Sequence, residues 1–236
     1  MKLFRTLAAT TAIFMICACS SNMISTEIEK NEYETDYSII STELLKINYP
    51  EDSAFAEKLN SEAKESQQVR VHGFEVDAED SFDMRPENTK AELKTTQNVK
   101  YAKNNFLSVV EEEYSFLGGT HGMTMWNAKN IDFTKKKQIY LGDLFADQNY
   151  ENILNNMIDN LLQTNKEEYS ELWEHPRIQE EHQYNFYITD TDLVIYFHPY
   201  ELSYYARGFV EFPLRLSELK GYLSEEYYFL AENKTE

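Results

Sequence analysis

The two cysteines of the chain lie close together near its N-terminus, and no other cysteine follows. Cys17 and Cys19 stand at the end of an apolar run that begins at Leu7, after a start that carries Lys2 and Arg5. The run is shorter than the about 20 apolar residues that span a bilayer, so it has the form of a secretory leader. If the leader is cleaved between the cysteines, no disulfide is available, and a packed apolar core must stabilise the rest of the chain.

The end of the leader resembles a bacterial lipobox, because the small residue Ala18 directly precedes Cys19. The resemblance implies cleavage before Cys19 and a lipid on its sulfur that anchors the protein in a membrane. The other interpretation is an ordinary secretory signal. Ser20 follows the cysteine where an aspartate would retain such a protein at the inner membrane. We therefore expect the cell envelope, and in a Gram-negative cell the periplasmic face of the outer membrane.

The chain is strongly acidic, with a formal charge of −19 that becomes −21 when Lys2 and Arg5 leave with the leader. The absence of a basic stripe argues against nucleic acid as a partner. An acidic surface favours a basic partner or calcium. The alternative is a solvated surface that only keeps the protein soluble.

Apolar spacing and turn residues predict an α+β protein. A strand-like segment ends at Tyr49, and Asp52 or Ser53 can cap a helix that continues to about Gly73. Asn104 and Asn105 tolerate positive φ, so they predict a tight hairpin turn. Helical spacing covers residues 149–173, and further strands are expected at 123–133, 184–188, 193–197 and 209–212.

This order of elements predicts a mostly antiparallel sheet with helices packed on one face, in two intimately packed modules. We expect a lipoprotein signal peptide at residues 1–18 and a flexible acidic tether at 19–36. An N-terminal module is expected at 37–122 and a C-terminal module at 123–230.

Three segments follow one another in a recognisable order. They are Gly118–Gly122 (GGTHG), the run from Asn130 to Phe145, and Phe197–Glu201 (FHPYE) with Tyr204, Tyr205 and Gly208 behind it. The order resembles the extracellular domain pair of the RsiV anti-sigma factor family, whose members are lysozyme receptors. Similar modules occur in uncharacterised lipoproteins, and the first of them accompanies a peptidoglycan deacetylase.

The resemblance implies recognition of a cell-wall hydrolase or a wall fragment. The chain shows a lipid-anchor signal where an anti-sigma factor has a spanning helix and a cytoplasmic segment. We therefore expect no anti-sigma role.

The glycine-rich segment is interpreted as a structural turn. Gly118 and Gly119 are expected to end a strand where a Cβ would clash, and Gly122 restarts the chain. No Lys-Ser/Thr pair follows, so the segment is not a phosphate-binding Walker loop. His121 is expected to bond neighbouring carbonyls rather than act as a ligand or base.

No local motif for catalysis or metal binding stands out. His175 and His182 are separated by Pro176, and no HExxH or G-x-S-x-G spacing occurs. We therefore expect no catalytic residue, no metal, no cofactor and a protein that is not an enzyme.

The loop PYELSYYARG, residues 199–208, is the candidate binding segment. Its candidate residues are Pro199, Tyr200, Glu201, Tyr204 and Tyr205. Tyrosines provide large contact areas at low entropic cost, and a carboxylate can pair with an arginine-rich partner. The alternative is that the tyrosines pack onto the sheet while the nearby arginine pairs internally.

The leading prediction is a lipid-anchored envelope protein that binds lysozyme, another cationic wall hydrolase or a peptidoglycan fragment. A non-catalytic structural or accessory envelope lipoprotein is the alternative, and a peptidoglycan-modifying enzyme is third. Copurification of stable envelope partners without affinity for wall enzymes would favour the accessory role, and a cleft of perturbed carboxylates would favour the enzyme.

Overall fold

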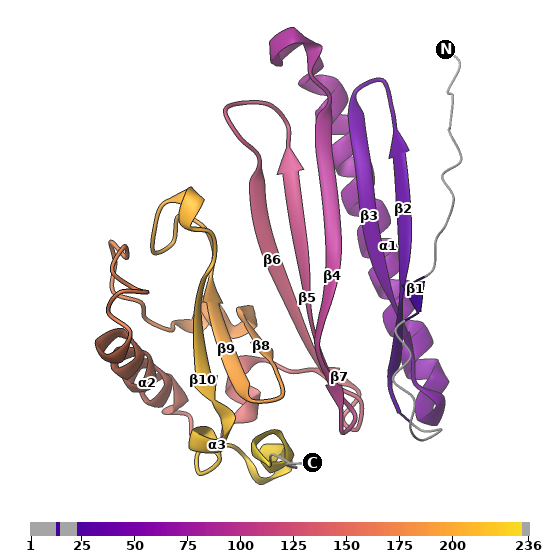
Figure 1. Cartoon of the computed structure of the whole chain (residues 1–236). Coiled ribbons are helices and arrows are strands. Elements are labelled where there is room, and N and C mark those ends of the chain that lie inside the picture. Colours follow the sequence, from indigo (N-terminus) through magenta and orange to yellow (C-terminus); the bar gives the residue numbers. More distant parts are fainter. Residues whose placement is uncertain (1–12, 15–22, 233–236) are drawn as a thin grey trace. The chain divides into compact units, whose positions relative to one another are not determined.

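The structure, a computed structural model, describes residues 13–14 and 23–232 (Figure 1). The chain divides into two compact units. Unit 1 comprises Met1–Asn98 and Glu111–Trp126, and unit 2 comprises Val99–Val110 and Asn127–Glu236.

The described strands form one sheet in the order β1-β2-β3-β4-β5-β6-β7 and a second in the order β10-β9-β8. Strands β3 and β4 pair in parallel, whereas β2 with β3 and both pairs of the small sheet are antiparallel. The predicted α+β class with a mostly antiparallel sheet is confirmed. The strands are β1 (Ile13–Phe14), β2 (Ser25–Glu34), β3 (Ser38–Asn48), β4 (Ala91–Lys103), β5 (Phe106–Phe116), β6 (Met123–Asp132), β7 (Lys137–Gln138), β8 (Phe186–Ile188), β9 (Asp192–Phe197) and β10 (Val210–Arg215); the helices are α1 (Ser53–Asp80), α2 (Tyr150–Thr164) and α3 (Leu216–Leu219).

In unit 1, α1 connects the two parallel strands and runs along one face of the sheet (Figure 1). The helix begins where the Asp52 carboxylate accepts a hydrogen bond from the backbone N–H of Phe55 at 3.0 Å. Further along, Phe74 and Ala78 pack against Ile40 of β3 and Leu93 of β4. Burial of these side chains stabilises the helix on the sheet.

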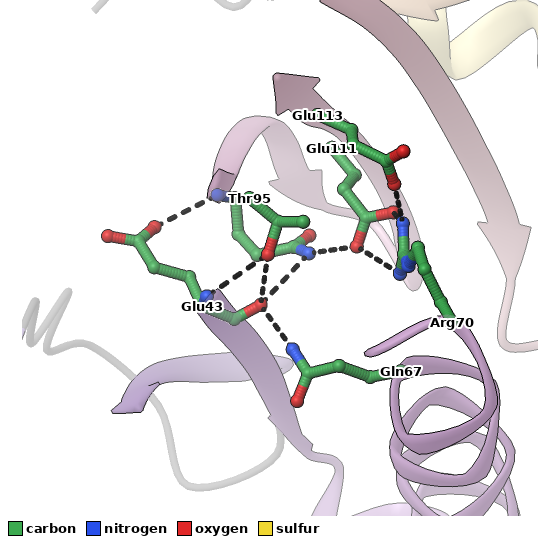
Figure 2. A network of polar contacts seen from close by, with 7 residues as sticks. Glu43, Gln67, Arg70, Thr95, Glu111 and Glu113 are labelled. Carbon is green, nitrogen blue, oxygen red and sulfur yellow. Dashed lines mark hydrogen bonds and ion pairs between the residues drawn. The ribbon is translucent and has the colours of Figure 1, made fainter. Parts of the chain in front are cut away.

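A polar network also joins α1 to the sheet (Figure 2). Arg70 contacts Glu111 at 2.5 Å and Glu113 at 2.7 Å, both on β5. Gln97 of β4 donates to Glu111 at 2.6 Å, and its backbone N–H donates to Glu43 of β3 at 2.9 Å. Burial alone would lower the pKa of Arg70, but the hydrogen bonds that Arg70 donates to the two carboxylates, together with their negative charge, raise it above its ordinary value.

Unit 2 has an aromatic and aliphatic core. The small sheet contributes Phe186, Phe197 and Phe212, all nearly inaccessible to solvent, and α2 inserts Leu154 and Ile158. Figure 1 shows α2 beside β10, in agreement with the contacts between these two elements.

The predicted turn between β4 and β5 is confirmed. Asn104 and Asn105 have φ values of 54° and 56°, so both lie in the left-handed region. This combination is the type I′ geometry that suits the twist of a two-residue hairpin.

Two predicted boundaries are wrong in the N-terminal half. Ser25–Glu34, part of the expected tether, forms β2 and pairs with β3. The strand is rich in charged side chains, and this composition is also typical of a linker. Near the margin of a sheet such charges prevent pairing with another molecule. Helix α1 continues past Gly73 to Asp80, because the contacts of Phe74 and Ala78 offset the roughly 1 kcal/mol cost of an exposed helical glycine.

One prediction also differs in the C-terminal half. Helix α2 ends at Thr164 rather than near Trp173, because Tyr169 turns into the core and stacks on Phe212. The two compact units exchange segments along the strands, so that the β4–β5 turn belongs to unit 2, and the module border expected at residues 122/123 stays a prediction.

Candidate functional site

The predicted binding residues lie on the loop between β9 and β10. Tyr200 and Tyr204 are 48% and 42% exposed, Glu201 is exposed, Tyr205 is half-buried and Pro199 is buried. Tyr200 and Tyr205 lie close together, with ring centroids 5.7 Å apart. The loop therefore exposes two tyrosine rings to solvent, while Pro199 at its start is buried.

Hydrogen bonds within this loop restrain its conformation. The Glu201 carboxylate accepts from the backbone N–H of His198, and the backbone N–H of Tyr200 donates to Ser203 at 3.0 Å. Tyr200 has a φ of +73°, a strained value for a bulky side chain that persists only where the surroundings impose it. Burial lowers the pKa of His198 below its ordinary value, and the charge of Glu201 opposes the change.

A second loop, which follows α2, adds a tryptophan to this surface. The backbone N–H of Trp173 donates to Leu202 at 3.0 Å, and Ser203 Oγ donates to the carbonyl of Glu171 at 3.0 Å. Tyr204 donates its hydroxyl to the Glu171 carboxylate at 2.5 Å, which raises the pKa of Tyr204. Trp173 itself is 54% exposed. We name the side chains of Trp173, Tyr200, Tyr204 and Tyr205 the aromatic surface.

The structure bears on the alternative interpretation of the loop, in which the tyrosines pack onto the sheet and the arginine pairs internally. Arg207 donates to the carbonyl of Glu168 at 2.5 Å, which is the internal pairing that the alternative describes. Tyr200 and Tyr204 nevertheless remain largely exposed rather than packed onto the sheet. Trp173 was missed by the sequence reasoning, because the helical pattern was extended to it and a lone tryptophan has no spacing to mark it.

A shallow hollow of about 290 Å³ lies beside Trp173. Burial raises the pKa of Tyr169, one of its lining residues, to about 12, and the Tyr169 hydroxyl donates to the carbonyl of Glu211 at 2.9 Å. We name this feature the Trp173 hollow, and it is lined by Leu162, Tyr169, Leu172, Trp173, Glu174, His175 and Pro176.

Asp159 of α2 holds His175, one of the residues that line the hollow. Its carboxylate contacts His175 at 2.7 Å and Arg177 at 2.8 Å. The hydrogen bond from Arg177 is the largest of the effects that lower the pKa of Asp159. The two basic side chains next to the hollow are therefore both engaged by one carboxylate.

The glycine-rich segment forms a turn between β5 and β6. Gly118 and Gly119 have φ values of +114° and +103°, which favour glycine. A Cβ at Gly122 would lie 2.4 Å from the Tyr114 ring. His121 Nδ1 lies 2.7 Å from the carbonyl oxygen of Gly122.

The predicted lipid anchor, a metal site and a membrane-spanning helix can be compared only with the described residues. Cys19 and most of residues 1–18 lie outside the described residues. Among residues 13–14 and 23–232, no cluster of three metal-ligating side chains occurs. Within the same residues, no helix has the length and apolar character needed to cross a bilayer.

Two family models match the chain. The model described as "Deacetylase PdaC" matches residues 29–124, and the model described as "Protein of unknown function (DUF3298)" matches residues 142–217. The aromatic surface lies within the DUF3298 match. The resemblance to the RsiV family stays a prediction.

One curated protein is similar over most of the chain. The peptidoglycan-N-acetylmuramic acid deacetylase PdaC of Bacillus subtilis (strain 168) is 27% identical over 192 residues, which are 80% of this chain and 40% of that protein. The chain thus spans about two fifths of the length of this curated relative.

Two crystal structures of DUF3298 family proteins share the fold. The protein from Bacteroides fragilis NCTC 9343 has a TM-score of 0.66 and 16% identity, over 92% of this chain and 98% of that one. The protein from Pseudomonas aeruginosa PAO1 has a TM-score of 0.59 and 13% identity, over 89% and 97%. At these identities the likeness concerns the fold alone.

The expectation that the chain is not an enzyme is corrected by these matches. The family model over residues 29–124 and the curated relative both carry the name of a deacetylase. The expectation was based on the absence of short catalytic motifs. Such motifs detect only residues that are close in the sequence, so they do not detect a site built from distant segments.

Proposed function

We propose that this protein belongs to a peptidoglycan-deacetylating system of the cell envelope and that it holds the glycan strand on the aromatic surface. The similarity of 80% of the chain to a protein named as a peptidoglycan deacetylase supports the substrate class. The aromatic surface supports the mode of binding.

The chemistry of a glycan strand suits this surface. A pyranose ring presents C–H groups on its faces, which pack against aromatic rings, and hydroxyl and amide groups at its edge. Trp173, Tyr200 and Tyr204 offer exposed ring faces, and Glu171 and Glu201 provide carboxylate oxygens beside them. Few conformations need to be frozen on binding, because backbone hydrogen bonds already hold both loops.

The exposure of Trp173 is the single observation that carries this proposal. An indole on a restrained loop, on the same surface as two exposed tyrosines, leaves apolar area in water that a ligand can cover. Aromatic anchors of this kind dominate binding energies in protein recognition.

Cosedimentation with purified, insoluble peptidoglycan tests the proposal. The unaltered protein is expected in the pellet, and Trp173→Ala is expected to weaken binding about tenfold, equivalent to about 1.4 kcal/mol. Tyr222→Ala removes a ring that is 47% exposed outside the aromatic surface and should not change binding. Absence of the unaltered protein from the pellet contradicts the proposal.

The negative charge favours a cationic hydrolase such as lysozyme as a second candidate ligand. A formal charge of −19 attracts a basic protein by long-range steering that salt weakens. Calorimetry with lysozyme should then give binding heat at low salt and less at moderate salt. No heat under either condition removes this candidate.

Cys19 is the proposed point of attachment to the envelope. The lipobox resemblance implies that the Cys19 sulfur receives a lipid and that the leader is cleaved before this residue. Cells grown with labelled palmitate should incorporate label into the protein and not into Cys19→Ser. Label in the variant would place the lipid elsewhere or exclude this anchor.

A further inference from the structure

We infer that the Trp173 hollow binds the free amino group of a deacetylated amino sugar, so that the protein prefers glycan whose N-acetyl groups have been removed. This inference rests on the proposed glycan binding and assigns its substrate class. It depends on the charge balance around Glu174.

The Glu174 carboxylate has an uncompensated charge. It is exposed at the wall of the hollow, and within the described part of the chain it has no hydrogen bond or ion pair. The nearest basic side chains in the sequence, His175 and Arg177, both contact Asp159 instead. A cation that enters the hollow therefore meets a carboxylate that no internal group neutralises.

The hollow offers a second contact that also selects a cation. Trp173 adjoins Glu174, and an indole face attracts an ammonium group within about 6 Å. Leu162 and Leu172 supply the apolar part of the lining, which suits the ring carbons of a sugar. The volume of about 290 Å³ lies near the lower end of the roughly 300–1,000 Å³ typical of ligand pockets, and suits one sugar residue rather than a folded chain.

An acetylated nitrogen satisfies neither contact. Acetylation converts the ammonium group into a neutral amide, which removes the attraction to the carboxylate and to the indole face. The preference for the free amine should therefore come from Glu174, whereas stacking of the sugar ring comes from Trp173 and serves both forms.

Calorimetric titration of the purified protein with chitotetraose in its fully deacetylated and fully N-acetylated forms tests this inference. At pH 6, where the sugar amine is charged, the deacetylated form should bind about fivefold more tightly, the effect of an exposed ion pair worth about 1 kcal/mol. Glu174→Gln should abolish the preference and retain the affinity for the acetylated form. Glu167→Gln is the matched control, because it alters an exposed carboxylate of the same segment that does not line the hollow.

The other outcomes of the titration distinguish a failure of the amine preference from a failure of the proposed glycan binding. Equal binding of both sugars, weakened by Trp173→Ala, overturns the amine preference and leaves glycan binding intact. Binding of neither sugar overturns both. If only lysozyme binds and Glu174→Gln weakens it, the hollow takes a basic side chain of a protein, and the amino-sugar inference is wrong.

Discussion

Unit 1 and unit 2 differ in the groups that join their helices to their sheets. In unit 1, Arg70 of α1 reaches two carboxylates of β5, and the charges are satisfied inside the unit. In unit 2, aliphatic side chains of α2 pack into the core, and the loops outside the core expose the aromatic side chains of Trp173, Tyr200 and Tyr204. The exposed rings on these loops are the reason why the proposed glycan binding is assigned to unit 2.

The largest expected effect comes from removing an aromatic side chain of the unit 2 core. Phe212 is inaccessible to solvent, stacks on Tyr169 at 5.0 Å and meets Phe197 edge-on at 5.8 Å. Phe212→Ala should lower the free energy of unfolding by about 4 kcal/mol through lost contacts and a cavity. Urea denaturation combined with hydrogen exchange should localise the loss to unit 2. An equal loss of protection in unit 1 would contradict the distinction between the units.

The polar network of unit 1 should give the next largest effect. Arg70→Met removes the guanidinium and leaves Glu111 and Glu113 facing each other without a cation. The free energy of unfolding should fall by about 3 kcal/mol, as expected when one partner of a largely buried ion pair is removed. The exchange rates of the α1 amides should rise most.

A matched control lies on the same helix. Lys58 and Glu62 form an exposed pair, so Lys58→Met should change stability by less than about 0.5 kcal/mol. A comparable loss in both variants would show that the Arg70 network contributes no more than surface charge.

A smaller, pH-dependent effect is expected in unit 2. Burial lowers the pKa of His198 below 6.5, with Glu201 opposing the change and His182 reinforcing it. The unfolded chain therefore takes up a proton first as the pH falls. The contribution to stability is full above pH 6.5 and declines as the pH falls toward the folded-state pKa. His198→Gln should flatten the stability profile just below pH 6.5, and an unchanged slope would exclude His198 as its cause.

The sequence predicts those features of the structure that neighbouring residues determine, and not those that depend on contacts between distant residues. The Asn104–Asn105 turn was predictable because both residues tolerate positive φ wherever they occur. The end of α2 was not, because it depends on Tyr169 reaching Phe212, a contact between distant residues. Strand β2 was missed because its pairing with β3 outweighs a charged composition.

The candidate site was predictable in part for the same reason. The tyrosine-rich run at residues 199–208 stood out by composition alone. Trp173 lies beside this run only because hydrogen bonds connect the two loops, and no local sequence pattern predicts such a contact. Glu174 lacks a basic partner because His175 and Arg177 both contact Asp159 of α2. These contacts join two segments of the chain, so the sequence pattern does not predict them.

The two tryptophans allow the most direct test, because one lies in each unit. Trp126 belongs to unit 1, where its indole donates to Glu112 at 2.8 Å, and Trp173 belongs to the aromatic surface of unit 2. Soluble peptidoglycan fragments can be titrated into Trp126→Phe, which reports on Trp173, and into Trp173→Phe, which reports on Trp126. We expect the emission of Trp173 to shift to shorter wavelength with saturation, and that of Trp126 to stay unchanged. A change confined to Trp126, or no change in either protein, would contradict glycan binding at the aromatic surface.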